Sequence, residues 1–132
     1  MISPELQALV QYRLTQATEA IESARLLVQN RHLRDATNRS YYAMFYATLA
    51  LLAYRGKRAS KHTGVLSLFD IEFVRTGLFS KQYSDWFHRA FDLRQDSDYR
   101  EMFQVSEQGT EEVLIQAEAF VAEVKSYLSR ER

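Results

Sequence analysis

The sequence predicts an all-α protein, an up-and-down bundle of four to five helices, on three observations. The 132 residues include one proline and four glycines, so few residues break a helix or build the tight turns of a sheet. Apolar residues recur at spacings of three and four, as on one face of a helix. The connections between these segments are short, which favours antiparallel neighbouring helices.

The first predicted helix begins at Ser3-Pro4, where serine can cap the helix and proline needs no hydrogen-bond partner. It ends at Asn30–His32. Its apolar side chains form one stripe, made of Val10, Leu14, Ala17, Ile21, Ala24 and Val28.

The second predicted helix runs from Leu33 to Arg55, and Gly56 follows its end. The helix is apolar on nearly all sides, so we expect it in the middle of the bundle. One stripe has mostly small side chains that let a neighbour approach closely: Ala36, Ser40, Ala43, Ala47, Ala50 and Tyr54.

The third predicted helix runs from Ser60 to Thr76 and ends at Gly77, and the fourth begins after Ser80. The stretch Gln95–Val105 is polar, which predicts an irregular or kinked connection. The last helix, Ser106–Leu128, has the same periodicity as the first. No linker or repeat divides the chain, so residues 1–132 are expected to form a single domain.

The composition excludes several classes of function. Seventeen basic residues balance seventeen acidic ones, so a protein that binds nucleic acid through overall positive charge is not indicated. The absence of cysteine excludes disulfide scaffolds, thiolate zinc sites and cysteine nucleophiles. No apolar run is long enough to span a bilayer and no signal-peptide pattern is present, so we expect a soluble cytoplasmic protein that does not bind membranes.

The charge is nevertheless uneven along the chain. Residues 25–61 carry eight basic side chains and one acid, whereas residues 101–132 carry seven glutamates and three basic residues. Thirteen of the seventeen basic residues are arginine, which suits bidentate contacts to phosphate or carboxylate. Two interpretations remain open: solvated helix ends, or a surface that binds RNA or another anion.

Three segments combine residues that could carry chemistry. The first is Asn38–Ala47, with Arg39 and Tyr42, whose alternative role is structural: amphipathic tyrosines in the core and an arginine paired with an internal carboxylate. The second is Lys61-His62-Thr63-Gly64, where a helix N-terminus could hold an anion beside histidine, or where the histidine is only half exposed near a cap.

The third segment, Asp92–Arg100, holds Arg94, Asp98 and Tyr99 and is either a site or a charge-paired connector. Its three aspartates could bind a metal ion, but the neighbouring arginines oppose this and the spacing does not fit an EF-hand. We therefore expect no metal and no cofactor. The common nucleotide-binding and hydrolase motifs are absent.

In these segments the chain resembles the small stand-alone bacterial and archaeal members of the HEPN-domain proteins (higher eukaryotes and prokaryotes nucleotide-binding). The resemblance covers nearly the whole chain. It rests on Arg39–Phe45, on Lys61–Val65, on Leu93-Arg94 followed by Asp98-Tyr99, and on the closing helix with Ala117, Phe120 and Leu128.

The resemblance implies a helical bundle that forms a homodimer. Many members are toxin-like, metal-independent endoribonucleases encoded beside a minimal nucleotidyltransferase, which serves as the antitoxin. Their catalytic pattern is an arginine, four to six intervening residues and a histidine. In that pattern arginine stabilises charge on the phosphate and histidine moves protons.

This sequence departs from the pattern at one position: Arg94 and four intervening residues lead to Tyr99 instead of histidine. A phenol has an ordinary pKa of about 10 and is a poor acid–base catalyst at neutral pH. The sequence thus leaves open whether the protein is an enzyme.

The leading hypothesis is a protein of a toxin–antitoxin-type pair that binds RNA or nucleotide in a cleft lined by Arg94, Asp98 and Tyr99. In the catalytic version it cleaves RNA without a metal, with Tyr99 or His62 moving protons. Four further residues are second candidates for binding RNA or nucleotide: Arg39, Tyr42, Lys61 and His62. The alternatives are a non-catalytic module that docks a nucleotidyltransferase partner, and a bundle that binds a small anionic metabolite.

Overall fold

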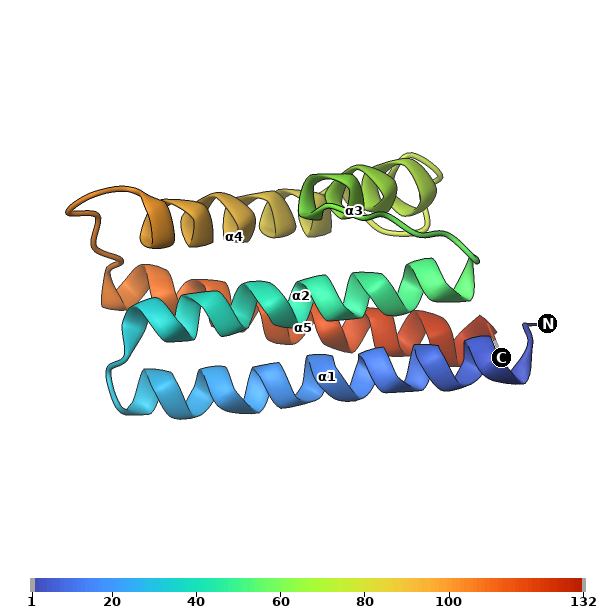
Figure 1. The fold of residues 1–132 in the computed structure, drawn as a ribbon, viewed down its shortest axis with the longest axis horizontal. Coiled ribbons are helices and arrows are strands. Elements are labelled where there is room, and N and C mark those ends of the chain that lie inside the picture. The colour runs from blue at the N-terminus through green and yellow to red at the C-terminus, as the bar shows by residue number, and fades with distance from the viewer. Residues whose placement is uncertain (1, 132) are drawn as a thin grey trace.

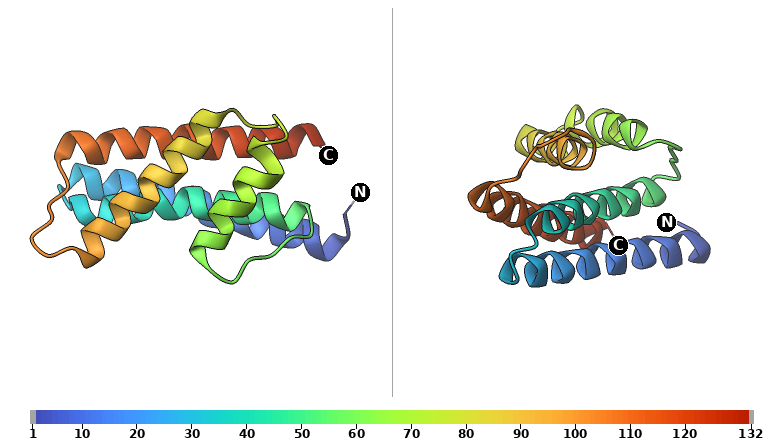
Figure 2. Two further views of the ribbon diagram at one scale, coloured as in Figure 1. Left: turned by 90° about the horizontal axis from the view of Figure 1, so that it is seen from above. Right: turned by 60° about the vertical axis from the view of Figure 1, so that its left-hand side comes forward.

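A computed structural model gives the fold of residues 2–131. Three long helices, α1 (Pro4–Gln29), α2 (Leu33–Tyr54) and α5 (Glu107–Glu131), lie side by side (Figure 1). Helices α3 (His62–Phe69) and α4 (Lys81–Tyr99) cross over them as a second layer (Figure 2). Along the chain, α1, α2, α4 and α5 alternate in direction, so α2 and α5 run the same way, and residues 2–131 contain no strand (Figure 1). The predicted up-and-down all-α bundle is confirmed.

The predicted ends of α1 and α2 are also confirmed. The backbone N–H of Leu6 donates a hydrogen bond of 3.1 Å to Ser3 Oγ, the expected cap of α1. Helix α2 ends at Tyr54 with Arg55 as its C-cap, and the next residue, Gly56, has φ +67°. The N–H of Lys57 donates to the carbonyl of Leu52 at 2.8 Å, as in a Schellman motif.

Helix α2 is central, as its composition predicts, because it packs against α1, α3, α4 and α5. Helix α1 contacts only α2 and α5 in the described part of the chain. The small side chains of α2 are buried where the neighbouring helices pack against it. Large aromatic side chains fill the space among α3, α4 and α5. Among the most deeply buried aromatic residues are Tyr41, Phe69, Phe73, Phe87 and Phe120.

The third predicted helix is wrong in one respect, because it is not α-helical throughout. Helix α3 is followed by a π-helical turn, η1 (Asp70–Val74), in which the N–H of Arg75 donates to the carbonyl of Asp70 at 2.9 Å. The Asp70 carboxylate accepts hydrogen bonds from Ser84 Oγ at 2.6 Å and His88 Nε2 at 2.8 Å, both on α4. Such contacts with another helix leave no trace in the local periodicity.

The predicted irregular stretch Gln95–Val105 is wrong in its first half. Helix α4 continues to Tyr99, and the connection to α5 begins at Arg100. The helix persists because its polar residues fit it: Ser97 is small enough to be buried, at 4% exposed, and Arg94 pairs with Asp98 one turn later. Polarity alone therefore does not mark the end of this helix.

The beginning of α1 and the end of α5 lie at the same end of the bundle (Figure 1). None of the helices in residues 2–131 is both long and apolar enough to cross a bilayer.

Candidate functional site

The last two turns of α4 place Arg94 against the middle of α2. Its guanidinium carbon lies 5.6 Å from the ring centre of Tyr41 and 5.4 Å from that of Tyr42. Nη2 of Arg94 donates a hydrogen bond of 3.4 Å to Tyr42 Oη. A cation over aromatic faces is stabilised by their quadrupoles, so the two tyrosines hold the guanidinium in place. The Arg94 side chain is only 16% exposed.

The hydrogen-bonding capacity of Arg94 is mostly unused. Its Nε is buried and has no hydrogen-bond partner in residues 2–131. The nearest carboxylate, Asp98 Oδ2, is 3.4 Å from Nε, which makes an ion pair without the geometry of a hydrogen bond. A guanidinium has five N–H donors, and the bond to Tyr42 is the one that the described residues show. Arg94 is therefore a fixed cation that can still bind an acceptor.

Arg39 supplies a second guanidinium to the same place. Its Cζ lies 5.7 Å from the ring centre of Tyr42, and its Nε is also buried without a partner in the described residues. The expected alternative role of Arg39, pairing with an internal carboxylate, is not seen, because no ion pair within residues 2–131 involves it. Two arginines thus meet at Tyr42, where Asp98 is the paired acid.

His62, the first residue of α3, joins these residues through Tyr41. Its Nδ1 is 2.6 Å from Tyr41 Oη in a hydrogen bond, and its ring stacks on Phe45 at 4.3 Å with an angle of 14° between the planes. The edge of Tyr42 lies against the same imidazole, with 5.8 Å between ring centres. We call Arg39, Tyr41, Tyr42, His62, Arg94 and Asp98 the Arg94 cluster.

The surroundings shift two pKa values in this cluster. Burial lowers the pKa of His62 below its ordinary value, and the positive charge of Arg94 lowers it further. Burial raises the pKa of Tyr41 well above its ordinary value, although Arg94 opposes this. At neutral pH the cluster therefore contains a neutral imidazole bonded to a protonated phenol.

Tyr99 does not join the other predicted residues, because its side chain is 73% exposed and points to a different side of α4. The reason is geometric: five residues turn a helix by about 500°, which leaves Tyr99 about 140° away from Arg94 around the axis. Asp98, four residues on, stays near Arg94. Lys61 is exposed beside His62 at the start of α3 and makes no ion pair in the described residues.

Tyr41 and Phe45 were not predicted to be site residues, yet they position His62. Their spacing of four puts them on one face of α2, and that spacing is the signal that could have identified them. The contacts of Asp70 with Ser84 and His88 were also missed. Asp70 lies in η1, whereas Ser84 and His88 lie on α4, and no local pattern connects the two elements.

Three of the eight basic residues in residues 25–61 form ion pairs within the described part of the chain, namely Arg25, Arg31 and Arg55. Arg25 pairs with Glu118 at 2.6 Å and Arg31 with Glu107 at 2.9 Å, so α5 supplies carboxylates to α1 and to the turn that follows it. Lys57 and Arg58, in the connector before α3, are exposed and make no ion pair within residues 2–131. The unpaired positive charge is thus on the side of α2 and α3.

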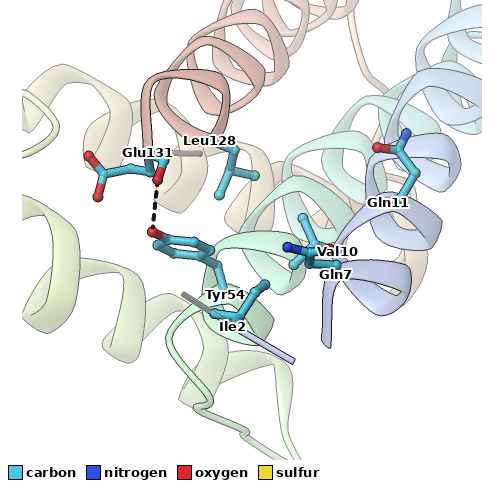
Figure 3. A pocket seen from close by; sticks show the side chains of 7 residues that line it. All are labelled: Ile2, Gln7, Val10, Gln11, Tyr54, Leu128 and Glu131. Carbon is cyan, nitrogen blue, oxygen red and sulfur yellow. Dashed lines mark hydrogen bonds between the residues drawn. The ribbon is translucent and has the colours of Figure 1, made fainter. Parts of the chain in front are cut away.

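Two hollows of the surface are lined by residues outside the cluster. One of about 360 Å³ is found where α1 begins and α2 and α5 end, and there Tyr54 Oη donates to the carbonyl of Glu131 at 3.5 Å (Figure 3). Another, of about 500 Å³, lies between α1, α2 and the connector, with Phe45 in its wall. None of the seven predicted site residues lines either hollow. The cluster is therefore a separate feature, on the face of α2 that packs against α3 and α4.

No group of three histidine, aspartate or glutamate side chains in residues 2–131 is arranged to hold a metal ion. What the Arg94 cluster offers is two arginines, a neutral imidazole and several aromatic faces. Arginines and aromatic rings bind phosphate and bases, respectively, in proteins that recognise single-stranded nucleic acid.

The sequence matches the HEPN domain family over residues 10–127, a range that includes every residue of the Arg94 cluster. A "UPF0332 protein" of Thermotoga maritima is 36% identical over 124 residues, which cover 94% of this chain and 94% of that protein.

Two Methanocaldococcus jannaschii proteins, each named "Putative toxin", are also similar to the chain. One is 33% identical over 127 residues, covering 96% of this chain and 91% of its own length. The other is 29% identical over 124 residues, covering 94% and 82%.

Proposed function

The chain belongs to the HEPN-domain family, and from this premise we propose that it is a toxin-like protein of a toxin–antitoxin-type pair that binds RNA through the Arg94 cluster. The observation that carries the proposal is Arg94 itself. It is held over two tyrosines, only 16% exposed, with most of its N–H groups unbonded in the described residues. Burying N–H groups without acceptors costs free energy, and a bound anion offsets this cost when it accepts their hydrogen bonds.

The catalytic form of the proposal is a metal-independent endoribonuclease. Arg94 binds the phosphodiester and stabilises the negative charge that develops on it during attack by the ribose 2′-hydroxyl. Arg39 lies against the same tyrosine and adds positive charge for the neighbouring phosphate. We propose that the active form is a homodimer, in which two copies of the cluster serve one strand of RNA.

The direct test is binding and cleavage of a short fluorescent single-stranded RNA by the wild type and by Arg94→Ala. The matched control is Arg89→Ala, which removes the same charge from the same helix, where Arg89 is 43% exposed and pairs with Glu112. Loss of a hydrogen-bonded charge contact costs about 1.5–3 kcal/mol, so Arg94→Ala should weaken binding at least ~10-fold. Arg89→Ala should stay within about twofold, as expected for an exposed pair.

Two readouts connect this test to the proposal. If Arg94 contacts a phosphate, its removal lowers the slope of log affinity against log salt by about 0.7. Growth arrest on expression in a bacterial host should also be lost with Arg94→Ala and kept with Arg89→Ala. Equal affinity and equal growth arrest for the two variants would contradict an RNA-binding role for the cluster.

A second candidate function has its own observation. Tyr99 is 73% exposed and Met102 is 98% exposed, so two large side chains with apolar surface are exposed to solvent where α4 connects to α5. Exposed apolar groups of this kind suit a protein interface. This favours a non-catalytic module that docks a minimal nucleotidyltransferase through the connection.

The two functions can be separated by purifying the protein with the product of an adjacent nucleotidyltransferase gene. A stable complex that Tyr99→Ser disrupts, together with no RNA cleavage by the free protein, would favour the docking module. A complex that survives Tyr99→Ser would argue against this surface.

A further inference from the structure

The imidazole ring of His62 has aromatic contacts on several sides. Three aromatic residues of α2 surround it: Tyr41 through the 2.6 Å hydrogen bond to Nδ1, Tyr42 with its edge, and Phe45 with its face. The imidazole is only partly buried. Its other nitrogen, Nε2, makes no hydrogen bond to any of residues 2–131. The structure thus fixes one ring nitrogen and leaves the other free.

Arg94 and His62 reach the same two tyrosines from different helices. The guanidinium of Arg94 lies 5.6 Å from the Tyr41 ring centre and 5.4 Å from that of Tyr42. The imidazole of His62 lies 5.8 Å from each of these ring centres. A cation for the phosphate and a ring nitrogen that can accept a proton therefore share one aromatic support.

We propose that His62 is the catalytic proton acceptor for RNA cleavage in this protein and that Tyr41 is its positioning residue. The inference rests on the proposed function. It assigns to α3 the task that the family's usual pattern would give to the position of Tyr99. The substrate class is an RNA phosphodiester with a free 2′-hydroxyl.

The step requires that the imidazole is neutral and that Nε2 carries the free electron pair. Nδ1–H then donates to the oxygen of Tyr41, whose phenol keeps its own proton because burial raises its pKa. Burial and the charge of Arg94 lower the pKa of His62, so the neutral ring predominates at neutral pH. The titratable groups that lie against the ring are Tyr41 and Tyr42 from α2, and Arg94 from α4 acts on the ring through its charge.

The reaction balances without any added reagent. Nε2 of His62 takes the proton of the 2′-hydroxyl, the 2′-oxygen forms a bond to phosphorus, and the bond from phosphorus to the 5′-oxygen breaks. The 5′-oxygen takes a proton from water, and the protonated His62 returns its proton to the hydroxide that remains. The products are a 2′,3′-cyclic phosphate and a 5′-hydroxyl.

The other candidates for this role fit less well. Tyr99 is 73% exposed and lies about 140° around α4 from Arg94. His88 Nε2 is bonded to Asp70, and no hydrogen bond or ion pair within residues 2–131 joins His88 to the cluster. His32 is exposed in the turn between α1 and α2.

Cleavage of a short single-stranded RNA tests the assignment, with kcat and KM measured against pH. His62→Gln should lower kcat at least ~100-fold and leave KM within about threefold, because it removes proton transfer and no phosphate contact. His32→Gln is the matched control, and it and Tyr99→Phe should cleave like the wild type. In the wild type, kcat should fall on acidification with a midpoint below the ordinary histidine value of about 6.5, and His62→Gln should lack this limb.

Tyr41→Phe separates positioning from simple support of the fold. It should lower kcat by about tenfold and change the midpoint of the acid limb, with little change in KM. Nitrogen NMR of labelled histidine gives a readout without catalysis: in the free wild type, Nδ1 of His62 should carry the proton.

The outcomes distinguish this inference from the proposed function. An RNA that binds and is cleaved equally by wild type and His62→Gln overturns the role of His62 and leaves the RNA-cleaving function intact. Binding without cleavage by the wild type also overturns it, as does a free wild type in which Nδ1 of His62 does not carry the proton. If the wild type does not bind RNA at all, the proposed function itself fails.

Discussion

Two buried serines on α4 should respond oppositely to the same substitution. Ser97 is 4% exposed, and its hydroxyl is buried with no hydrogen-bond partner in residues 2–131. Ser84 is 9% exposed, and its hydroxyl donates to Asp70 Oδ1 at 2.6 Å. Replacing each with alanine removes one oxygen atom from the same helix, so the pair isolates the value of the hydrogen bond.

The expected sizes follow from these contacts. Alanine gains about 0.5 kcal/mol of helix propensity over serine at either position. Ser97→Ala also removes a buried hydroxyl that lost its water on folding, which adds about 1 kcal/mol, so the protein gains about 1–2 kcal/mol. Ser84→Ala loses a hydrogen bond to a charged acceptor worth about 1.5–3 kcal/mol, and the net loss is about 1–2.5 kcal/mol.

Urea unfolding followed by circular dichroism measures both changes, provided that the m value stays constant. The melting temperature should rise by about 3–8 °C for Ser97→Ala and fall for Ser84→Ala. A loss of stability in Ser97→Ala similar to that in Ser84→Ala would show that the Ser97 hydroxyl has a partner.

Three further predictions concern stability. Because the folded state lowers the pKa of His62, the unfolded chain binds this proton more readily. The contribution of His62 to the free energy of unfolding is therefore fully present above about pH 6.5 and is lost as the pH falls below that value. His62→Gln should reduce the slope of melting temperature against pH between about pH 7.5 and 5.5. Gly56→Ala should cost about 1–2 kcal/mol in urea unfolding through its φ of +67° alone, because no atom lies within 4 Å of the added methyl group; a loss above about 3 kcal/mol would point to a steric clash instead. Phe120→Ala, at a fully buried position, should cost about 3–5 kcal/mol, and a change below about 1 kcal/mol would mean that the core collapses around the cavity.

The sequence predicts the helices wherever a local signal marks their ends. Ser3-Pro4 and Gly56 mark helix ends through the capping and the backbone conformation of a few neighbouring residues. The start of α1 and the end of α2 are where the sequence predicts them. The π-helical turn at Asp70 depends on contacts with α4, and the continuation of α4 to Tyr99 goes with the burial of Ser97 in the fold. A single sequence does not display those contacts, so these two predictions were wrong.

The candidate site was predictable in part for the same reason. Arg94 and Asp98 are one turn apart, so their proximity follows from helix geometry, and the same geometry excludes Tyr99. The crossing of the second layer over α2 decides the other contacts (Figure 2). It places Arg94 of α4 on Tyr42 and His62 of α3 on Tyr41. The sequence identified most of these residues but not their partners.

Tyr41 connects the Arg94 cluster to the core, and this determines how rigid the cluster is. Its ring is fully buried and lies 6.0 Å from that of Phe87, which in turn lies 5.4 Å from Phe120. Turning Tyr41 would require repacking of these rings, which a close-packed core resists. Its hydroxyl therefore holds the His62 imidazole at a place set by the core, and its face does the same for Arg94. Two polar side chains from different helices are thus positioned by one buried residue, which is what a site needs if it binds a phosphate without first rearranging.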